Sequence, residues 1–382
     1  GFIINAGSRD ELSTENGIAH LIEHCMFKGT KRRKAFHILT RLDSVGGEIN
    51  AYTTKEETSV YASALKEHFN RAAELLVDIT FSSIFPEKEI EKEKSVIVDE
   101  INSYKDNPDE MLMDEFEEKL FPDHPLGRSI LGTAELVNGF TRDDIMRFVE
   151  RNYSTDQIVF TCVGNVSLKK IETFSKNVLE KLPASTSNRA HRTIPKSKMF
   201  SESKKTSVHQ VHSLLGCKTI GFDDERRRAM VLMNNVLGGP ALNSRLNLNI
   251  RERFGYCYYI ESSYAPYADT GVFQIYFGTD KRHEKKVAKL IVKELKSLTD
   301  VTLSERLLSV AKKQLLGQIA LSQENRASLM LSLGKALLQF DRVDRFEEIQ
   351  AQVHDITSAE IQELAAETFD QQYLATLSYI PE

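Results

Sequence analysis

The chain carries an internal repeat, and this repeat constrains the possible folds more than any other feature of the sequence. A predicted strand and helix at 58–81 correspond to a strand and helix at 270–298 in the second half. The segment IVDEINSYKDNPDEMLMDEF aligns with LLGQIALSQENRASLMLSLG at a constant offset, so that Gln318 corresponds to Glu100. Such a repeat indicates duplicated domains of similar build. The predicted fold class is α+β: two homologous α/β domains, each a mostly antiparallel sheet packed with helices, joined by a linker as a clam-shell pair.

The boundary between the two halves is predicted from a change in composition. The stretch PASTSNRAHRTIPKSK, near the middle of the chain, is polar and has no sustained apolar period. Such segments are typical of linkers between domains. We therefore expect an N-terminal domain at 1–183, a linker at 184–207 and a homologous C-terminal domain at 208–382.

Hydrophobic periodicity predicts alternating strands and helices in the first half. Gly46 and Gly47 mark the end of one helix, and Pro86 marks the start of the longest one. A turn at 106–109 is expected to end that helix. The predicted strands are 1–6, 49–53, 58–64 and 158–163, and the predicted helices are 16–28, 35–45, 67–81, 87–104 and 111–120.

Charge and composition exclude several classes of function. The 382 residues include 50 Lys and Arg and 55 Asp and Glu, which gives a formal net charge of −5. An acidic chain lacks the basic face that nucleic acids and anionic membranes bind, so neither is an expected partner. No apolar run approaches the roughly 18 residues of a spanning helix. The four cysteines contain no Cys-x-x-Cys pair, which argues against a cysteine zinc site.

The start of the chain bears on its location. The first residues, GFIINAG, have the pattern of a buried strand already under way, without an initiator Met. We therefore expect the chain to begin inside a longer precursor. A reducing compartment, and hence the cytoplasm, is the default expectation for the location.

The sharpest chemical signal is the sequence His20-Leu21-Ile22-Glu23-His24. On a helix, residues four apart project from one face, so His20 and His24 can bind one Zn²⁺ through neutral imidazoles. Glu23 then lies close enough to take a proton from a zinc-bound water. The pattern H-x-x-E-H is the inverted form of the zincin motif. The alternative is a solvated helix face, but burying two histidines and a carboxylate in this apolar helix is costly without partners.

A third zinc ligand is expected on the long helix. Glu100 is the candidate, and Glu93 lies two turns before it on the same face. Catalytic zinc sites usually contain three protein ligands and a water. Asp99 is the nearest competitor for the role of Glu100, with a shorter side chain and a different helical direction.

These residues resemble the motif of the pitrilysin-type zinc peptidases, both in residue type and in the length of chain that separates His24 from Glu100. This is the inverzincin family that includes insulin-degrading enzyme and the mitochondrial processing peptidases. The resemblance covers almost the whole chain. It implies that His20, His24 and Glu100 bind one zinc ion per chain, and that Glu23 is the general base. It also implies that Glu93 supports catalysis from outside the ligand set, the alternative being a solvated helix charge.

Two further segments carry the resemblance. The segment GGEINAYTTKEETSVY resembles the family's edge strand beside the zinc, which holds the substrate backbone by strand addition. Asn50 and Ala51 are the candidate substrate-binding positions, with an ordinary strand contribution as the alternative. The segment LGGPALNSRLNLNIRERFGYCYYI resembles the family's Gly-rich turn and R-x6-Y pair, which implies catalytic and substrate-binding roles for Arg251 and Tyr258. A surface Arg and a core Tyr are the alternatives, and Arg253 or Tyr256 could be mistaken for the pair.

The resulting functional hypothesis is a zinc-dependent endopeptidase or oligopeptidase that cleaves short or unfolded peptides. Only the first domain can hold the zinc, because Gln318 replaces the glutamate and no H-x-x-E-H follows His24. By resemblance the chain is expected to form a homodimer or a related heterodimer. The alternatives are the catalytic half of a heterodimeric processing peptidase, a non-catalytic scaffold subunit, and a zinc-storing or sensing protein, which would not need Glu23.

Overall fold

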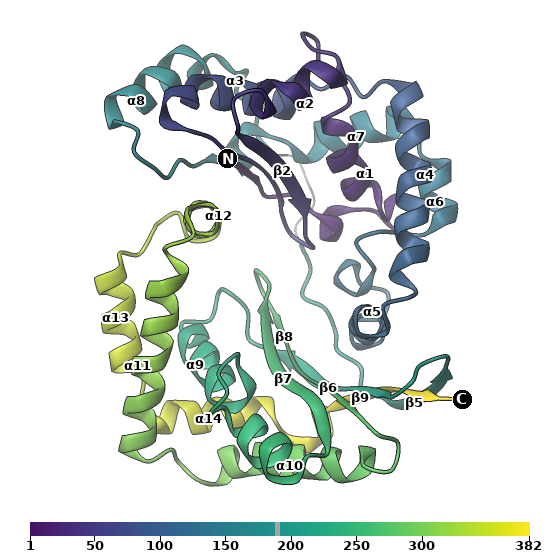
Figure 1. Cartoon of the computed structure of the whole chain (residues 1–382), viewed down its shortest axis with the longest axis vertical. Coiled ribbons are helices and arrows are strands. Elements are labelled where there is room, and N and C mark those ends of the chain that lie inside the picture. Colours follow the sequence, from purple (N-terminus) through teal and green to yellow (C-terminus); the bar gives the residue numbers. More distant parts are fainter. Residues whose placement is uncertain (188–191) are drawn as a thin grey trace. The chain divides into compact units, whose positions relative to one another are not determined.

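A computed structural model describes residues 1–187 and 192–382, and their contacts divide the chain into two units (Figure 1). The first unit contains Gly1–Ser103, Arg128–Thr193 and Ser322–Val343. The second contains Tyr104–Gly127, Ile194–Leu321 and Asp344–Glu382. Among the described residues, no helix is long and apolar enough to cross a membrane.

The first unit is built on a four-stranded antiparallel sheet with the order β2-β3-β1-β4. Its strands are β1 (Phe2–Ile4), β2 (Glu48–Thr53), β3 (Thr58–Ser63) and β4 (Ile158–Phe160). β2 lies at one edge and, among the described strands, pairs only with β3. The helices of this unit are α1 (Ile18–Met26), α2 (Ala35–Asp43), α3 (Phe69–Phe81), α4 (Glu87–Tyr104), α6 (Ala134–Gly139), α7 (Arg142–Asn152), α8 (Leu168–Asn177) and α12 (Arg326–Phe340).

The second unit contains a five-stranded sheet with the order β5-β9-β6-β8-β7. Its strands are β5 (Ser201–Thr206), β6 (Val211–Thr219), β7 (Cys257–Pro266), β8 (Gly271–Thr279) and β9 (Ala375–Pro381), and only the β5–β9 pair is parallel. Its helices are α5 (Pro108–Leu120), α9 (Arg227–Gly238), α10 (Glu284–Asp300), α11 (Glu305–Ser322), α13 (Phe346–Asp355) and α14 (Ser358–Thr368). The predicted α+β class, with mostly antiparallel sheets and helices, is confirmed.

The repeat is visible in matched helix boundaries. α4 and α11 begin and end at the same offset that relates Glu100 to Gln318, and α5 and α12 begin at that offset too. The two sheets also correspond, except that the first has no counterpart of β5 beside β4 among the described residues. The duplicated build predicted from the sequence therefore extends to individual elements.

The two halves of the chain exchange one helix each. α5 comes from the first half, yet Leu112 and Phe116 on it pack in the core of the second unit with Leu214 and Leu377. α12 comes from the second half and packs on β1 and β4 of the first unit. The compact units are therefore not the two continuous stretches of sequence that composition suggested.

The segment predicted as a linker is partly a strand. Residues 201–206 form β5, which pairs with β9 along its whole length. Its residues are polar and all but one are exposed, so the strand lacks the alternation of apolar and polar residues by which a strand is recognised in a sequence. Backbone pairing, which the sequence does not display, holds this strand in place.

Candidate metal centre

Helix α1 supplies three of the candidate site residues from two turns. Its apolar side chains Ile18, Leu21, Ile22 and Cys25 are fully buried in the core of the first unit. The helix begins later than predicted, because Gly17 adopts a left-handed conformation with φ +99° and cannot continue the helix backward. A side chain there would meet the Leu131 carbonyl oxygen at 2.7 Å, so the start of α1 is fixed by close packing.

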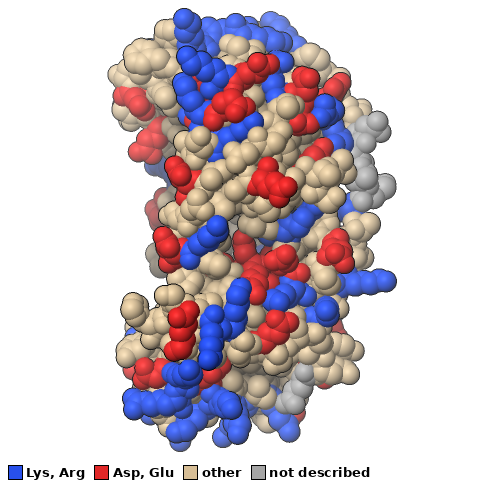
Figure 2. Space-filling view, turned by 90° about the vertical axis from the view of Figure 1, so that its right-hand side faces the viewer, with Lys and Arg blue, Asp and Glu red and all other residues tan. Residues whose placement is uncertain are grey.

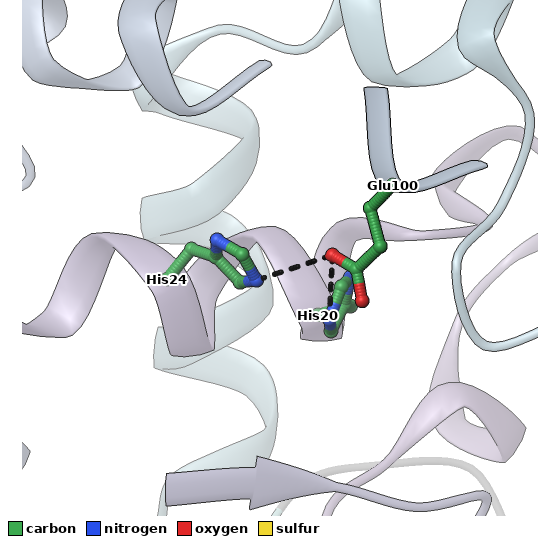
Figure 3. A group of neighbouring side chains, drawn as sticks. All are labelled: His20, His24 and Glu100. Carbon is green, nitrogen blue, oxygen red and sulfur yellow. Dashed lines mark ion pairs between the residues drawn. The ribbon is translucent and has the colours of Figure 1, made fainter. Parts of the chain in front are cut away.

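His20, His24 and Glu100 converge on one point (Figure 3). Nε2 of His20 lies 3.9 Å from Oε2 of Glu100, and Nε2 of His24 lies 3.6 Å from the same oxygen. The three ligand atoms all lie within 4.8 Å of one another. Two imidazole nitrogens and one carboxylate oxygen suit Zn²⁺, which prefers nitrogen and oxygen donors in this number at catalytic sites. The donor set therefore fits the metal that the motif predicts.

The surroundings of His20 favour the neutral form of its imidazole. His20 is only 8% exposed, and burial together with the neighbouring His24 lowers the pKa of its imidazole to about 4. The ring is therefore neutral near pH 7, which is the form that binds zinc. Glu100 is exposed, whereas Asp99, its competitor, does not belong to the cluster.

Glu93 orients His24 from behind the metal ligands. Its Oε2 lies 3.2 Å from Nδ1 of His24, and its Oε1 forms an ion pair with Nζ of Lys28 at 2.7 Å. Glu93 is buried, which excludes the alternative of a solvated helix charge. Carboxylate–histidine pairs of this kind fix the ring and tautomer of a metal ligand. Nothing in the sequence singled out Lys28, which lies in the turn two residues beyond the end of α1.

Glu23 contacts the edge strand. Oγ1 of Thr53, at the end of β2, donates a hydrogen bond to Oε2 of Glu23 at 2.7 Å. Burial raises the pKa of Glu23, and the bond from Thr53 opposes that rise. A carboxylate with a raised pKa is suited to accept a proton and to give it up again near neutral pH. Thr53 was also missed, because a contact between residues so far apart in the sequence leaves no local signal.

The first turn of α1 is held by an acidic side chain from outside the helix. Glu11 is 3% exposed, and its carboxylate accepts hydrogen bonds from the backbone N–H groups of Gly17 and Ala19. Burial raises the pKa of Glu11 to about 8, and these bonds oppose the rise. Nothing in the sequence identified Glu11, which precedes the helix by several residues.

The predicted substrate strand lies at a sheet edge. Asn50 and Ala51 belong to β2, whose second side is not paired with another strand of the described sheet. Oδ1 of Asn50 accepts the N–H of Ala51 at 2.9 Å. The register of β2 also directs Ala51 and Thr53 to one face and Asn50 to the other. The face of Ala51 is therefore the one from which Thr53 contacts Glu23.

Arg251 and Tyr258 lie in the second unit at two irregular points of the backbone. Arg251 is in the π-helical turn Asn247–Glu252, where its guanidinium donates to Oδ1 of Asn247 at 3.1 Å. Tyr258 lies at a β-bulge between Cys257 and Tyr259, and it is 72% exposed. The alternative of a core tyrosine is therefore wrong. π-turns and bulges commonly re-aim functional side chains.

The residues that could be mistaken for this pair have aromatic partners. Arg253 lies over the ring of Phe254, with 5.3 Å between the guanidinium carbon and the ring centroid. Tyr256 stacks on Phe254 and contacts His283. Both side chains thus take part in local packing.

Charged side chains of both signs are interspersed over the face of the molecule that Figure 2 shows. Lys and Arg gather at the upper and lower ends of this view, and Asp and Glu lie among and between them.

Comparisons with known proteins identify the family of this chain. The family model described as Insulinase (Peptidase family M16) matches residues 1–134, and the model Peptidase M16 inactive domain matches residues 139–315. The uncharacterized zinc protease YmxG of Bacillus subtilis is 34% identical over 380 residues, which cover 99% of this chain and 91% of that protein. The chain belongs to peptidase family M16.

A further relative and two solved structures also match almost the whole chain. An uncharacterized zinc protease of Streptomyces coelicolor is 32% identical, with 96% of this chain and 81% of that protein covered. The crystal structure of a peptidase M16 inactive domain from Pseudomonas fluorescens matches all of this chain and 92% of its own, with a TM-score of 0.91 at 20% identity. A protease from Helicobacter pylori matches all of this chain and 92% of its own, with a TM-score of 0.90 at 22% identity. The predicted family is confirmed, and the solved structures confirm the M16 fold.

Proposed function

We propose that this M16 chain is a zinc-dependent endopeptidase that hydrolyses short or unfolded peptides. The observation that carries the proposal is the convergence of His20, His24 and Glu100, with Glu23 on the same helix as the two histidines. This arrangement combines a zinc donor set with a carboxylate that belongs to no ligand position. A protein that only stores or senses zinc needs the donor set and has no use for Glu23.

Each residue of the site is proposed to have a distinct role in hydrolysis. His20, His24 and Glu100 would hold one zinc ion per chain, and a bound zinc ion supplies a Lewis acid that makes water nucleophilic near neutral pH. Glu23 would take the proton from the attacking water and deliver it to the leaving amine. The hydroxyl of Thr53 would hold the Glu23 carboxylate in place while it handles this proton.

Substrate binding is proposed at the edge of the sheet. A peptide that pairs with β2 near Asn50 and Ala51 would add a strand and be held mainly through its backbone. This mode favours extended, unfolded chains, because a folded protein has no free strand to offer. Arg251 and Tyr258 remain proposed substrate-binding and catalytic residues on the strength of the family resemblance, with Tyr258 as a candidate donor to the developing oxyanion.

The proposed base is tested by Glu23→Gln. The variant keeps every metal ligand, so it should bind as much zinc as the parent while losing about 100-fold or more of kcat. Glu91→Gln is the matched control, since Glu91 is an exposed glutamate on α4, the helix that also carries Glu93 and Glu100. Metal analysis and cleavage of a quenched-fluorescence peptide mixture give the two readouts. Parental turnover in Glu23→Gln would show that Glu23 is not the base.

A requirement for a second chain is tested separately. The proposal of a homodimer or a related heterodimer predicts a particle larger than one chain in gel filtration. An inactive single-chain particle that gains activity with a related M16 chain would favour the catalytic half of a heterodimer. A chain that binds zinc and stays inactive in every assembly would favour a scaffold role.

A further inference from the structure

The N-terminus of α1, the helix that carries His20 and His24, is not capped by the side chain of its own N-cap residue. The first N–H groups of an α-helix lack partners within the helix, and a Ser, Thr, Asp or Asn at the N-cap usually supplies one. In α1 the N-cap is Gly17, which has no side chain and makes no side-chain cap. His20 lies in the first turn of this helix, so whatever holds that turn also sets the position of His20.

Glu11 supplies the missing acceptors. Its Oε1 accepts the N–H of Ala19 at 2.9 Å, and its Oε2 accepts the N–H of Gly17 at 3.1 Å. Oε2 also accepts a hydrogen bond from Nδ2 of Asn16 at 3.1 Å, and that amide donates to the carbonyl of Ser129 at 2.8 Å. A carboxylate at a helix N-terminus is further favoured by the helix dipole. One buried side chain thus ties the first turn of α1 to two other segments.

The two histidine ligands differ in how they are held. His24 is oriented by Glu93, which contacts its Nδ1. Nδ1 of His20 is buried and has no hydrogen-bond partner among the described residues. No polar contact at Nδ1 from these residues therefore fixes the ring of His20, and its position depends on packing and on the backbone of the first turn. That backbone is the part of α1 that Glu11 binds.

We propose that Glu11 is a positioning residue for the metal centre, acting through the first turn of α1 on His20. The inference rests on the zinc site of the proposed function but not on peptidase turnover. Glu11 does not belong to the group of metal-ligating side chains. Loss of the Glu11 carboxylate should therefore lower zinc affinity and alter ligand geometry by more than any accompanying loss of folding stability explains.

Glu11→Gln is the test variant. It keeps the size of the side chain, but its amide NH₂ would face N–H donors where a carboxylate oxygen now accepts. Glu15→Gln is the matched control, because Glu15 also accepts a backbone N–H, from Leu12, and forms an ion pair with Arg151. Zinc affinity is measured by competition with a chromophoric chelator, and ligand geometry by the visible spectrum of the cobalt-substituted protein. Thermal unfolding of the metal-free proteins reports stability alone.

The expected result is a zinc affinity at least about tenfold lower in Glu11→Gln, with an altered cobalt spectrum, while Glu15→Gln matches the parent. Parental affinity and spectrum in a less stable Glu11→Gln would overturn the inference and leave the peptidase proposal intact. Glu11→Asp keeps the carboxyl group but is one methylene too short to reach both N–H groups. If Glu11→Gln does not fold, Glu11→Asp decides by the same two metal readouts. A parent chain that binds no zinc would overturn both proposals.

Discussion

The hydroxyl of Thr53 donates a hydrogen bond of 2.7 Å to the carboxylate of Glu23, and this bond joins the edge strand to the proposed general base. Thr53 is the last residue of β2, the strand proposed to pair with the substrate. In this proposal the same strand positions both the peptide and the group that handles its proton. A substitution in β2 should therefore affect the position of the Glu23 carboxylate even where no substrate contact is lost.

Replacement of Thr53 tests this link. Thr53→Val keeps the shape of the side chain and removes the donor, so we expect kcat to fall about tenfold with a smaller change in KM. Thr53→Ser retains the hydroxyl and should recover most of the activity. Steady-state kinetics on one quenched peptide measure both values. Equal kcat in Thr53→Val and the parent would show that the bond does not position Glu23.

Lys28 should support the metal site through Glu93. The ammonium of Lys28 pairs with one oxygen of this buried carboxylate, and the other oxygen contacts His24. Lys28→Met leaves the Glu93 charge without its partner, and zinc affinity is expected to fall about tenfold. Lys92→Met on α4 removes an exposed ion pair with Glu89 and should have no such effect. Chelator competition compares the two, and equal affinities would contradict the role of Lys28.

The packing of α12 should be needed for the stability of the first unit. A Cβ atom at Gly334 would lie 2.3 Å from Cδ1 of Ile3, a fully buried side chain on β1. Gly334→Val should therefore lower the free energy of unfolding by about 1–3 kcal/mol. Gly317→Ala is the control, because a Cβ at that position on α11 meets nothing within 4 Å and should be neutral or slightly stabilising. Thermal melts of both variants measure the effect. An unchanged melting temperature in Gly334→Val would show that α12 does not pack on β1.

Acid should destabilise the second unit through His212. Its Nδ1 lies 2.7 Å from the hydroxyl of Tyr276, and burial lowers the pKa of His212 while Asp109 opposes the shift. A histidine whose pKa is lower in the folded state binds fewer protons there, so its contribution to stability is constant above the unfolded pKa of about 6.5 and falls below it. His212→Gln should flatten this fall in a pH series of thermal melts. His209→Gln, at an exposed position, should keep the parental slope, and an unchanged slope in His212→Gln would contradict the assignment.

The sequence predicted the chemistry of the site better than the assembly of the fold. The H-x-x-E-H spacing and the apolar period of α1 placed His20, His24 and Glu23, because helical geometry is local and regular. Hydrophobic periodicity and Pro86 gave the boundaries of α4, and the resemblance to the family motif gave Glu100 as the third ligand. Periodicity shows which face of a helix is apolar but not which sheet will cover it, so the exchange of α5 and α12 was not predicted.

The supporting contacts of the site were also beyond the sequence. Thr53, Lys28 and Glu11 act through hydrogen bonds and ion pairs with residues that folding brings together. A single polar residue in a strand or loop carries no period, and its partner is known only once the backbone is placed. The strand β5 escaped prediction for a related reason, since its pairing depends on backbone groups and its side chains are polar.

The central claim, zinc-dependent peptide hydrolysis, is tested most directly by metal removal and return. The purified chain is assayed on a mixed quenched-peptide library as isolated, after chelation and dialysis, and after addition of one equivalent of zinc. We expect cleavage that disappears with the metal and returns with zinc. Cleavage that survives complete metal removal, or a chain that binds no zinc and cleaves nothing, would contradict it.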